Sequence, residues 1–249
     1  MRLTTLLASA VLLACGPVLT GCGPTETTTA ALDTSGDCAA EKSLVRRALD
    51  RSTLRVDVDG DGRLDEVAVA TDHDAGKRCR AFVGVRLADG STYSTHLHPA
   101  AVPPIEGLQA RIVGLPDLGG TPGAQIVVDT RAAVDSVLAQ MFTLTGNGLR
   151  RVHVPVFEDG TFIVEGGGVV YPYGAACTGD GRMVLSTAEQ SDDGERFRVT
   201  RRTYEVSGPR IRFADPEVEE STVPLNDLDD RFPEFAGQHW RACTGEVRR

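Results

Sequence analysis

The segment Asp57-Val58-Asp59-Gly60-Asp61-Gly62-Arg63-Leu64-Asp65 has three aspartates at alternate positions, a fourth at its end, and two glycines between them. Calcium takes six to eight hard oxygen ligands, and alternating carboxylates on a tight loop converge on one point. Gly62 permits the sharp turn that such a loop needs. We therefore predict a calcium site whose side-chain ligands are Asp57, Asp59, Asp61 and Asp65, with the carbonyl of Arg63 as a backbone ligand.

The segments that flank this loop have the period of β-strands. Leu54 to Val58 and Glu66 to Ala70 alternate between the two faces, as half-buried strands do. A helix-flanked EF-hand instead needs a glutamate at its twelfth position, where this chain has Ala68. The loop is thus expected between two strands, and an acidic β-turn without metal is the alternative interpretation.

Loops and turns of the same kind recur along the chain at intervals of about 60 residues. A second loop rich in Asp and Gly begins at Asp117, and a third ends in Gly179-Asp180-Gly181-Arg182. An apolar strand follows each loop, and a glycine hairpin turn lies about 30 residues past each loop start. The three turns are Asp89-Gly90, Asn147-Gly148 and Ser207-Gly208. This spacing predicts three copies of one four-stranded unit.

Residues 57–69 resemble the calcium loop of FG-GAP repeats, the blade unit of integrin α-subunit propellers and of many bacterial surface proteins. In that family the loop joins the first two strands of a blade. The resemblance implies a mostly β fold of about three propeller-blade-like repeats. The later loops are weaker matches with too few carboxylates for calcium. They keep Asp117, Gly119, Gly120 and Gln125 in the second loop, and Asp180 and Gly181 in the third.

The number of units limits how the fold can close. At about 60 residues each, a seven-bladed ring needs roughly 420 residues, more than this chain of 249 residues has. A partial or small propeller, a stacked β-array, and a ring completed by another subunit are the alternatives. We expect residues 37–249 to form this single β-rich domain, beginning with a short helix from Ala39 to Asp50 capped by Asp37.

The N-terminus has the layout of a secretory signal. Arg2 precedes an apolar run from Leu6 to Leu13, which is too short to span a bilayer. Leu19-Thr20-Gly21-Cys22 resembles a bacterial lipobox, which implies cleavage after residue 21 and lipidation of Cys22. Residues 22–36 would then form a flexible tether. Cys15 in Leu12-Leu13-Ala14-Cys15 is a second candidate for lipidation, and an ordinary cleaved signal is the alternative.

Four further cysteines are expected to pair, since an exported domain folds in an oxidising compartment. Four cysteines allow three connectivities. We favour the two pairings in which each bond joins a terminal segment to the body, Cys38 with Cys79 and Cys177 with Cys243. A four-cysteine zinc site would need close paired spacings such as C-x-x-C, and the sequence has none.

The charge and the missing motifs restrict the function. The formal net charge is −9, which argues against nucleic acid as a partner. The sequence lacks nucleophile-elbow, zinc-protease, phosphate-loop and dinucleotide motifs. We therefore expect a non-enzymatic lipoprotein on the outer face of the cell membrane that uses a calcium-binding β-scaffold to bind an extracellular protein or glycan. The alternative is a surface hydrolase with an unrecognised pair of carboxylates.

Overall fold

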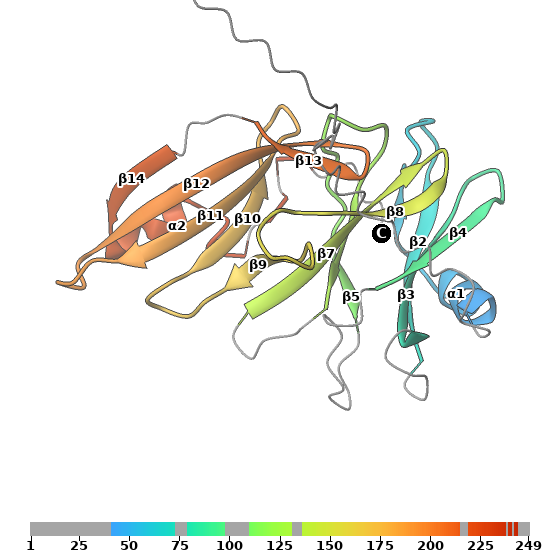
Figure 1. Cartoon of the computed structure of the whole chain (residues 1–249), viewed down its shortest axis with the longest axis horizontal. Coiled ribbons are helices and arrows are strands. Elements are labelled where there is room, and N and C mark those ends of the chain that lie inside the picture. The colour runs from blue at the N-terminus through green and yellow to red at the C-terminus, as the bar shows by residue number, and fades with distance from the viewer. Residues whose placement is uncertain are drawn as a thin grey trace, which may run out of the picture. The chain divides into compact units, whose positions relative to one another are not determined.

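The computed structural model describes residues 41–72, 79–97, 110–130, 136–214, 219–237, 239–240 and 242–243. The predicted signal, the tether, Cys15, Cys22 and Cys38 lie outside these ranges. The described chain is mostly β, as predicted, with strands in two antiparallel sheets and two short α-helices (Figure 1). Among the described residues, no helix has the length and apolar character needed to cross a membrane.

Helix α1 (Glu41–Leu49) lies within the span predicted for the N-terminal helix. Its buried side chains, Val45 and Leu49, pack in one cluster with Ala68, Ala70 and Phe82. The helix approaches the sheet closely, since a Cβ placed on Gly84 would lie 2.3 Å from a methyl carbon of Val45. The helix therefore covers one face of the first sheet.

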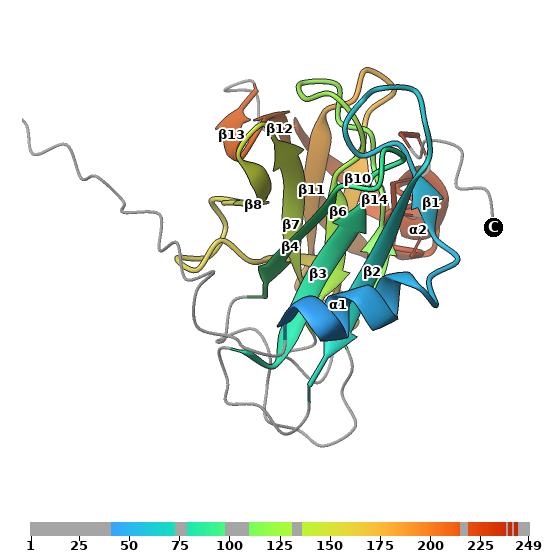
Figure 2. The ribbon, with the colours of Figure 1, turned by 90° about the vertical axis from the view of Figure 1, so that its right-hand side faces the viewer.

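The first sheet contains four consecutive antiparallel strands in the order β1-β2-β3-β4, seen face-on in Figure 2. These strands are β1 (Arg55–Val56), β2 (Asp65–Thr71), β3 (Ala81–Arg86) and β4 (Thr92–His96). The turn between β3 and β4 contains Gly90 at φ 91°, a left-handed conformation that favours glycine. The Asp89-Gly90 hairpin is therefore confirmed.

The second sheet contains ten strands. Eight of them follow the order β13-β12-β11-β10-β9-β7-β6-β5, while β8 pairs with β7 and β14 pairs with β12. The bounds are β5 (Arg111–Gly114), β6 (Ile126–Asp129), β7 (Ser136–Thr145), β8 (Gly148–Val152), β9 (Phe162–Gly166), β10 (Tyr173–Cys177), β11 (Met183–Gln190), β12 (Arg196–Ser207), β13 (Arg210–Phe213) and β14 (Glu219–Pro224). A 3-10 helix (Leu225–Asp227) and α2 (Leu228–Arg231) follow β14.

The same order of strands occurs three times. Consecutive antiparallel strands form a first run (β1 to β4), a second run (β5 to β8) and a third run (β10 to β13). In each run an Asp/Gly loop joins the first two strands, and a glycine hairpin joins the last two. The hairpins predicted at Asn147-Gly148 and Ser207-Gly208 are both present.

The buried core joins the two sheets and the C-terminal segment. Val67 and Val83 of the first sheet share a cluster with Ile126 and Phe142 of the second. In a neighbouring cluster, Trp240 packs edge-on against Phe162 with ring centroids 6.5 Å apart. The predicted disulfide between Cys177 and Cys243 is present and fixes this C-terminal segment to β10. Cys79 is also disulfide-bonded, and Cys38, its predicted partner, lies outside the described residues.

Candidate metal site

The first loop, residues 57–64, joins β1 to β2 and turns at two glycines. Gly60 and Gly62 have φ values of 78° and 83°, which residues with a Cβ rarely adopt. Gly60 also lies against the second loop, because a Cβ on it would be 2.7 Å from the Cβ of Pro122. Gly62 has open space around it, so its backbone angle alone explains the glycine.

This turn brings three of the four predicted aspartates together. One carboxylate oxygen from each of Asp57, Asp59 and Asp61 lies within 4.8 Å of the other two. Calcium–oxygen bonds of 2.3–2.6 Å place ligands on opposite sides of the ion about 4.6–5.2 Å apart. The three oxygens therefore fit within one calcium coordination sphere.

Backbone amides hold these carboxylates in place. The two carboxylate oxygens of Asp57 accept from the N–H groups of Gly60 at 2.6 Å and Gly62 at 2.8 Å. Asp59 accepts from Asp61 N–H at 3.1 Å, and Asp61 accepts from Arg63 N–H at 2.7 Å. Each carboxylate oxygen keeps further lone pairs, so these bonds orient the site and leave it able to bind a cation.

Burial and neighbouring charges affect the acidity of Asp59 in the loop. Partial burial, together with the carboxylates of Asp61 and Asp57, raises the pKa of Asp59 above its usual range, although the amide of Asp61 lowers it. A cation bound between the three carboxylates would favour their charged forms and offset this repulsion. The chemistry of the donor set therefore fits calcium.

Asp65, the fourth predicted ligand, lies outside this cluster. Its side chain is fully buried, and its two oxygens accept from the N–H groups of Val58 at 2.8 Å and Ala88 at 2.9 Å. Burial raises the pKa of Asp65, and the two amide hydrogen bonds oppose that shift. In this geometry Asp65 joins the first loop to the β3–β4 turn.

Arg63, predicted to offer its carbonyl, makes two other contacts with its guanidinium group. The Nη2 atom donates to the carbonyl of Ala88 at 2.8 Å, and Nη1 lies 3.8 Å from Asp61 Oδ2. The side chain therefore places a positive charge beside the cluster and, like Asp65, connects the first loop to the β3–β4 turn.

The second loop, residues 117–124, has the same length and a different internal chemistry. Gln125 stands where the first loop is followed by Asp65, and its Oε1 accepts from Leu118 N–H at 2.8 Å, as Asp65 accepts from Val58. Its Nε2 donates to Thr121 Oγ1 at 2.6 Å and to the carbonyl of Gly123 at 2.9 Å. An amide suits these partners, because one is a donor and two are acceptors.

The same comparison explains why an aspartate stands at position 65, since both hydrogen-bond partners of Asp65 are N–H donors. Sequence reasoning missed this pair of roles. Their common spacing could have indicated the shared role, because Asp65 and Gln125 each stand seven residues after the residue whose amide they bind.

The third loop, residues 178–182, is shorter and contains one acidic side chain. Asp180 accepts hydrogen bonds from the hydroxyl of Thr178 and from Arg182 Nε, which lies 2.9 Å away. These two bonds lower the pKa of Asp180. The carboxylate is thus committed to partners within the loop, and no second metal cluster occurs in the described ranges.

The three loops lie side by side. Ala124 N–H of the second loop donates to the carbonyl of Asp57 at 2.8 Å. Gly123 leaves room for the first loop, because a Cβ on it would lie 2.3 Å from the carbonyl oxygen of Val58. Between the second and third loops, a Cβ on Gly181 would lie 2.4 Å from the nitrogen of Gly119. Close backbone contacts therefore link all three loops.

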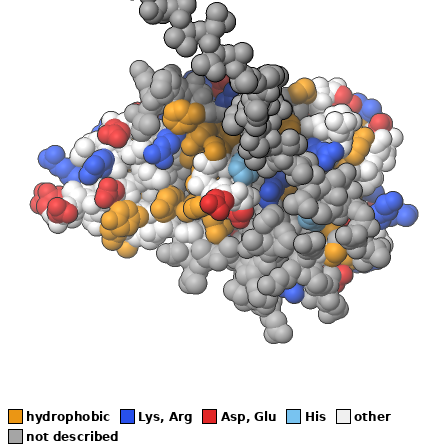
Figure 3. Space-filling model, in the orientation of Figure 1, with side chains coloured by type: hydrophobic (Ala, Val, Ile, Leu, Met, Phe, Trp, Pro, Cys, Tyr) orange, Lys and Arg blue, Asp and Glu red, His pale blue; other side chains and the backbone are white. Residues whose placement is uncertain are grey.

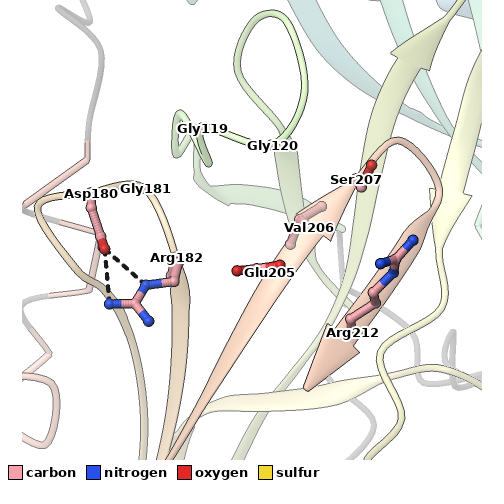
Figure 4. Close-up of a pocket in the computed structure, with 9 residues that line it drawn as sticks. All are labelled: Gly119, Gly120, Asp180, Gly181, Arg182, Glu205, Val206, Ser207 and Arg212. Carbon is pink, nitrogen blue, oxygen red and sulfur yellow. Dashed lines mark hydrogen bonds and ion pairs between the residues drawn. The ribbon is translucent and has the colours of Figure 1, made fainter. Parts of the chain in front are cut away.

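A cavity of about 640 Å³ lies beside the second and third loops (Figure 4). Two carboxylates line it, Asp180 and Glu205, together with Arg182 and Arg212. Asp180 forms an ion pair with Arg182 at 2.8 Å, and its lowered pKa favours the charged form. A general acid in glycoside hydrolysis needs the opposite shift, so Asp180 is not suited to that role.

The buried carboxylate of Glu234 is held by two side chains of the second sheet. Glu234 is 2 % exposed, and its Oε1 accepts from Ser186 Oγ at 2.7 Å and from Arg201 Nε at 3.1 Å. The carboxylate holds the segment after α2 against β11 and β12. It therefore stabilises the fold and takes no part in the candidate site.

Comparisons with known proteins give no relative for this chain: no family model matches it, and neither the curated proteins nor the solved structures contain a match.

Proposed function

We propose that this protein is a lipid-anchored extracellular binding module whose first loop binds one calcium ion. The convergence of Asp57, Asp59 and Asp61 carries the calcium part of the proposal. The three carboxylates supply hard oxygen ligands, and backbone amides orient them. Carbonyl groups and water would complete the six to eight ligands that calcium takes.

The repeated strand order supports a scaffold of three propeller-blade-like units. Each run has its Asp/Gly loop between the first and second strands, the place that the calcium loop occupies in FG-GAP blades. Only the first loop carries three alternating aspartates. The other two loops also have internal side-chain hydrogen bonds, but each has one acidic side chain, too few for a calcium site.

Calcium in the first loop would stabilise more than that loop. Asp57 offers its carboxylate to the ion, and its carbonyl accepts from Ala124 of the second loop. Ordering Asp57 therefore also orders the contact between the first two loops. The proposed role of the ion is to stiffen this row of loops as a platform for an extracellular protein or glycan.

The proposed location is the outer face of a membrane, with Cys22 as the lipid-carrying residue. The signal-like N-terminus supports export. The disulfide between Cys177 and Cys243 is of the kind that persists in an oxidising compartment. Extracellular modules bind calcium with dissociation constants of about 10⁻⁴–10⁻³ M, so a moderate site would suffice there.

Thermal unfolding in calcium and in chelator tests the calcium part. The wild-type chain should melt at a higher temperature in calcium, because binding to the folded state stabilises it. The double variant Asp57→Asn, Asp61→Asn should lose this shift. Asp117→Asn is the matched control, since Asp117 stands at the position of Asp57 in the second loop, and it should keep the shift. An equal shift in the double variant would refute the site.

Mass spectrometry of the protein extracted from its native membrane tests the anchor. The expected N-terminal peptide begins at a diacylglyceryl-modified Cys22, and Cys22→Ser should release the protein from the membrane fraction. An unmodified Cys22, or a modified Cys15, would contradict the assignment.

A further inference from the structure

The long third strand of the second and third runs has two neighbours on the same side. In β7, the half near the hairpin pairs with β8 and the half that begins the strand pairs with β9. In β12, the corresponding halves pair with β13 and β14. Strands β9 and β14 are therefore equivalent, each being a fifth strand added after a run of four.

The outer edge of β9 shows what such a strand binds. It pairs with β10, the first strand of the next run, through two residue pairs, Gly166 with Tyr173 and Glu165 with Gly174. The outer edge of β14 is different: within the described residues, β14 pairs with β12 only. Within the described residues, the outer edge of β14 therefore lacks a neighbour equivalent to β10, the first strand of a run that pairs with β9.

The backbone of β14 is oriented to accept one. Leu225 N–H donates to the carbonyl of Glu195 at 2.9 Å, and hydrogen-bonded residues alternate along an antiparallel ladder. Val223 and Ser221 therefore bond to β12, whereas the N–H and C=O groups of Glu220 and Thr222 point away from it. These two exposed residues offer backbone donors and acceptors to a further strand.

The complementary edge lies at the start of the domain. Strand β1 is the first strand of its run, as β10 is, and it is at the edge of the first sheet. Val67 N–H donates to the carbonyl of Leu54 at 3.3 Å, so the next residue, Arg55, directs its backbone groups away from β2. Strand β1 contains two residues, so the edge that it offers is short.

We propose that the chain associates head to tail with a second copy, β14 of one copy pairing with β1 of the other as β9 pairs with β10. Such an interface joins two different surfaces, so it either closes into a ring or extends. The polar character of the edge fits a reversible contact: acidic and basic side chains are interspersed at the end of the molecule where β12 and β14 lie (Figures 1 and 3).

The association is expected to be weak in solution. A stable interface buries about 800 Å² per partner, more than a short edge pairing supplies. On a membrane, copies held by lipid anchors would share one surface, which raises their effective concentration. The inference does not depend on calcium or on the anchor, since it rests on the equivalence of β9 and β14.

Sedimentation velocity over a concentration series tests the proposal, with the full chain in detergent. The sedimentation coefficient of the wild type should rise with protein concentration. Thr222→Pro should abolish the rise, because it removes an outward N–H and leaves the bonds to β12; Pro224 already occupies the next outward position of the same strand. Thr222→Val is the matched control, since it keeps the N–H, and should associate as the wild type does. A wild type that stays monomeric, or Thr222→Pro that associates equally, would overturn the proposal.

Amide hydrogen exchange at low and high protein concentration identifies the paired strands. Association should slow exchange at Thr222 and at Arg55 together. Protection of Ile112 on β5 in place of Arg55 would show that another edge is used and would overturn the pairing. Thr222→Pro should also keep the calcium-induced rise in melting temperature, so failure of the self-association and failure of the calcium site are distinguishable.

Discussion

Substitution of Asp65 is expected to destabilise the fold even in the absence of calcium. The carboxylate is fully buried and accepts two backbone hydrogen bonds, from Val58 and from Ala88. Asp65→Ala leaves both donors without their acceptor. An unsatisfied buried N–H costs about 1–3 kcal/mol, and this full range applies to Val58, which is itself buried.

The second donor is expected to contribute less. Ala88 is exposed, so its N–H can bind water once the carboxylate is gone. The sum for Asp65→Ala is about 2–4 kcal/mol of unfolding free energy. Asp65→Asn keeps one acceptor oxygen and turns an NH₂ group toward the other donor, which should lower the free energy of unfolding by about 1–2 kcal/mol.

Urea denaturation in the presence of a calcium chelator measures these differences directly. Gln125→Glu is the matched control in the second loop, because it removes the two donations to Thr121 and Gly123 and introduces a buried charge. It should destabilise the protein by more than Asp65→Asn does. If Asp65→Ala lowers the free energy of unfolding by less than about 1 kcal/mol in chelator, the assignment of Asp65 to the loop framework is refuted.

Three further outcomes follow from the same contacts. Because the pKa of Asp59 is raised above 3.8, the calcium affinity measured by titration should begin to fall at a higher pH than it would with an ordinary aspartate. In chelator the sign is opposite: ionisation of Asp59 should destabilise the fold as the pH rises through its raised pKa. Gly123→Ala should destabilise the protein more than Gly62→Ala in thermal unfolding, since both glycines have positive φ but only Gly123 lies against a neighbouring backbone, that of the first loop; equal effects would contradict the close packing of the loops. Replacing Cys177 and Cys243 by serine should lower the unfolding free energy by about 4 kcal/mol from the lost closure of a loop with 66-residue separation, and no change on denaturation would show that this crosslink does not restrict the unfolded chain.

Local sequence signals predicted much of the architecture. The three glycine turns are all present because a hairpin turn with positive φ has few alternatives to glycine. The alternation from Glu66 to Ala70 lies within β2, and the run from Phe197 to Tyr204 lies within the longer β12. Neither strand buries a single face. Val67 and Ala68 of β2 belong to different core clusters, and so do Phe197 and Tyr204 of β12, so residues with high strand propensity marked these strands better than strict alternation did.

The fifth strands could not be predicted in this way. Strand β9 has five residues, of which Phe162 and Val164 are buried, and β14 has a single fully buried side chain, Val223. Their positions depend on pairing with distant parts of β7 and β12. Such pairing leaves little periodic pattern in a short segment, so tertiary contacts decide it.

The candidate site was predicted in part. The alternation of Asp57, Asp59 and Asp61 brought those three carboxylates together, because a tight loop places every second side chain on one side. The spacing alone did not distinguish a ligand at Asp65 from a carboxylate that binds backbone amides. That distinction depends on where the β3–β4 turn lies, and the local sequence carries no record of it.

Isothermal titration of calcium into the metal-free full chain measures binding to the proposed site itself. We expect binding of about one calcium per chain with a dissociation constant near the millimolar range. The double variant Asp57→Asn, Asp61→Asn should give only the heat of dilution, whereas Asp117→Asn should bind as the wild type does. A wild-type chain without a binding heat above dilution at any temperature, or an unchanged isotherm in the double variant, would contradict the calcium site.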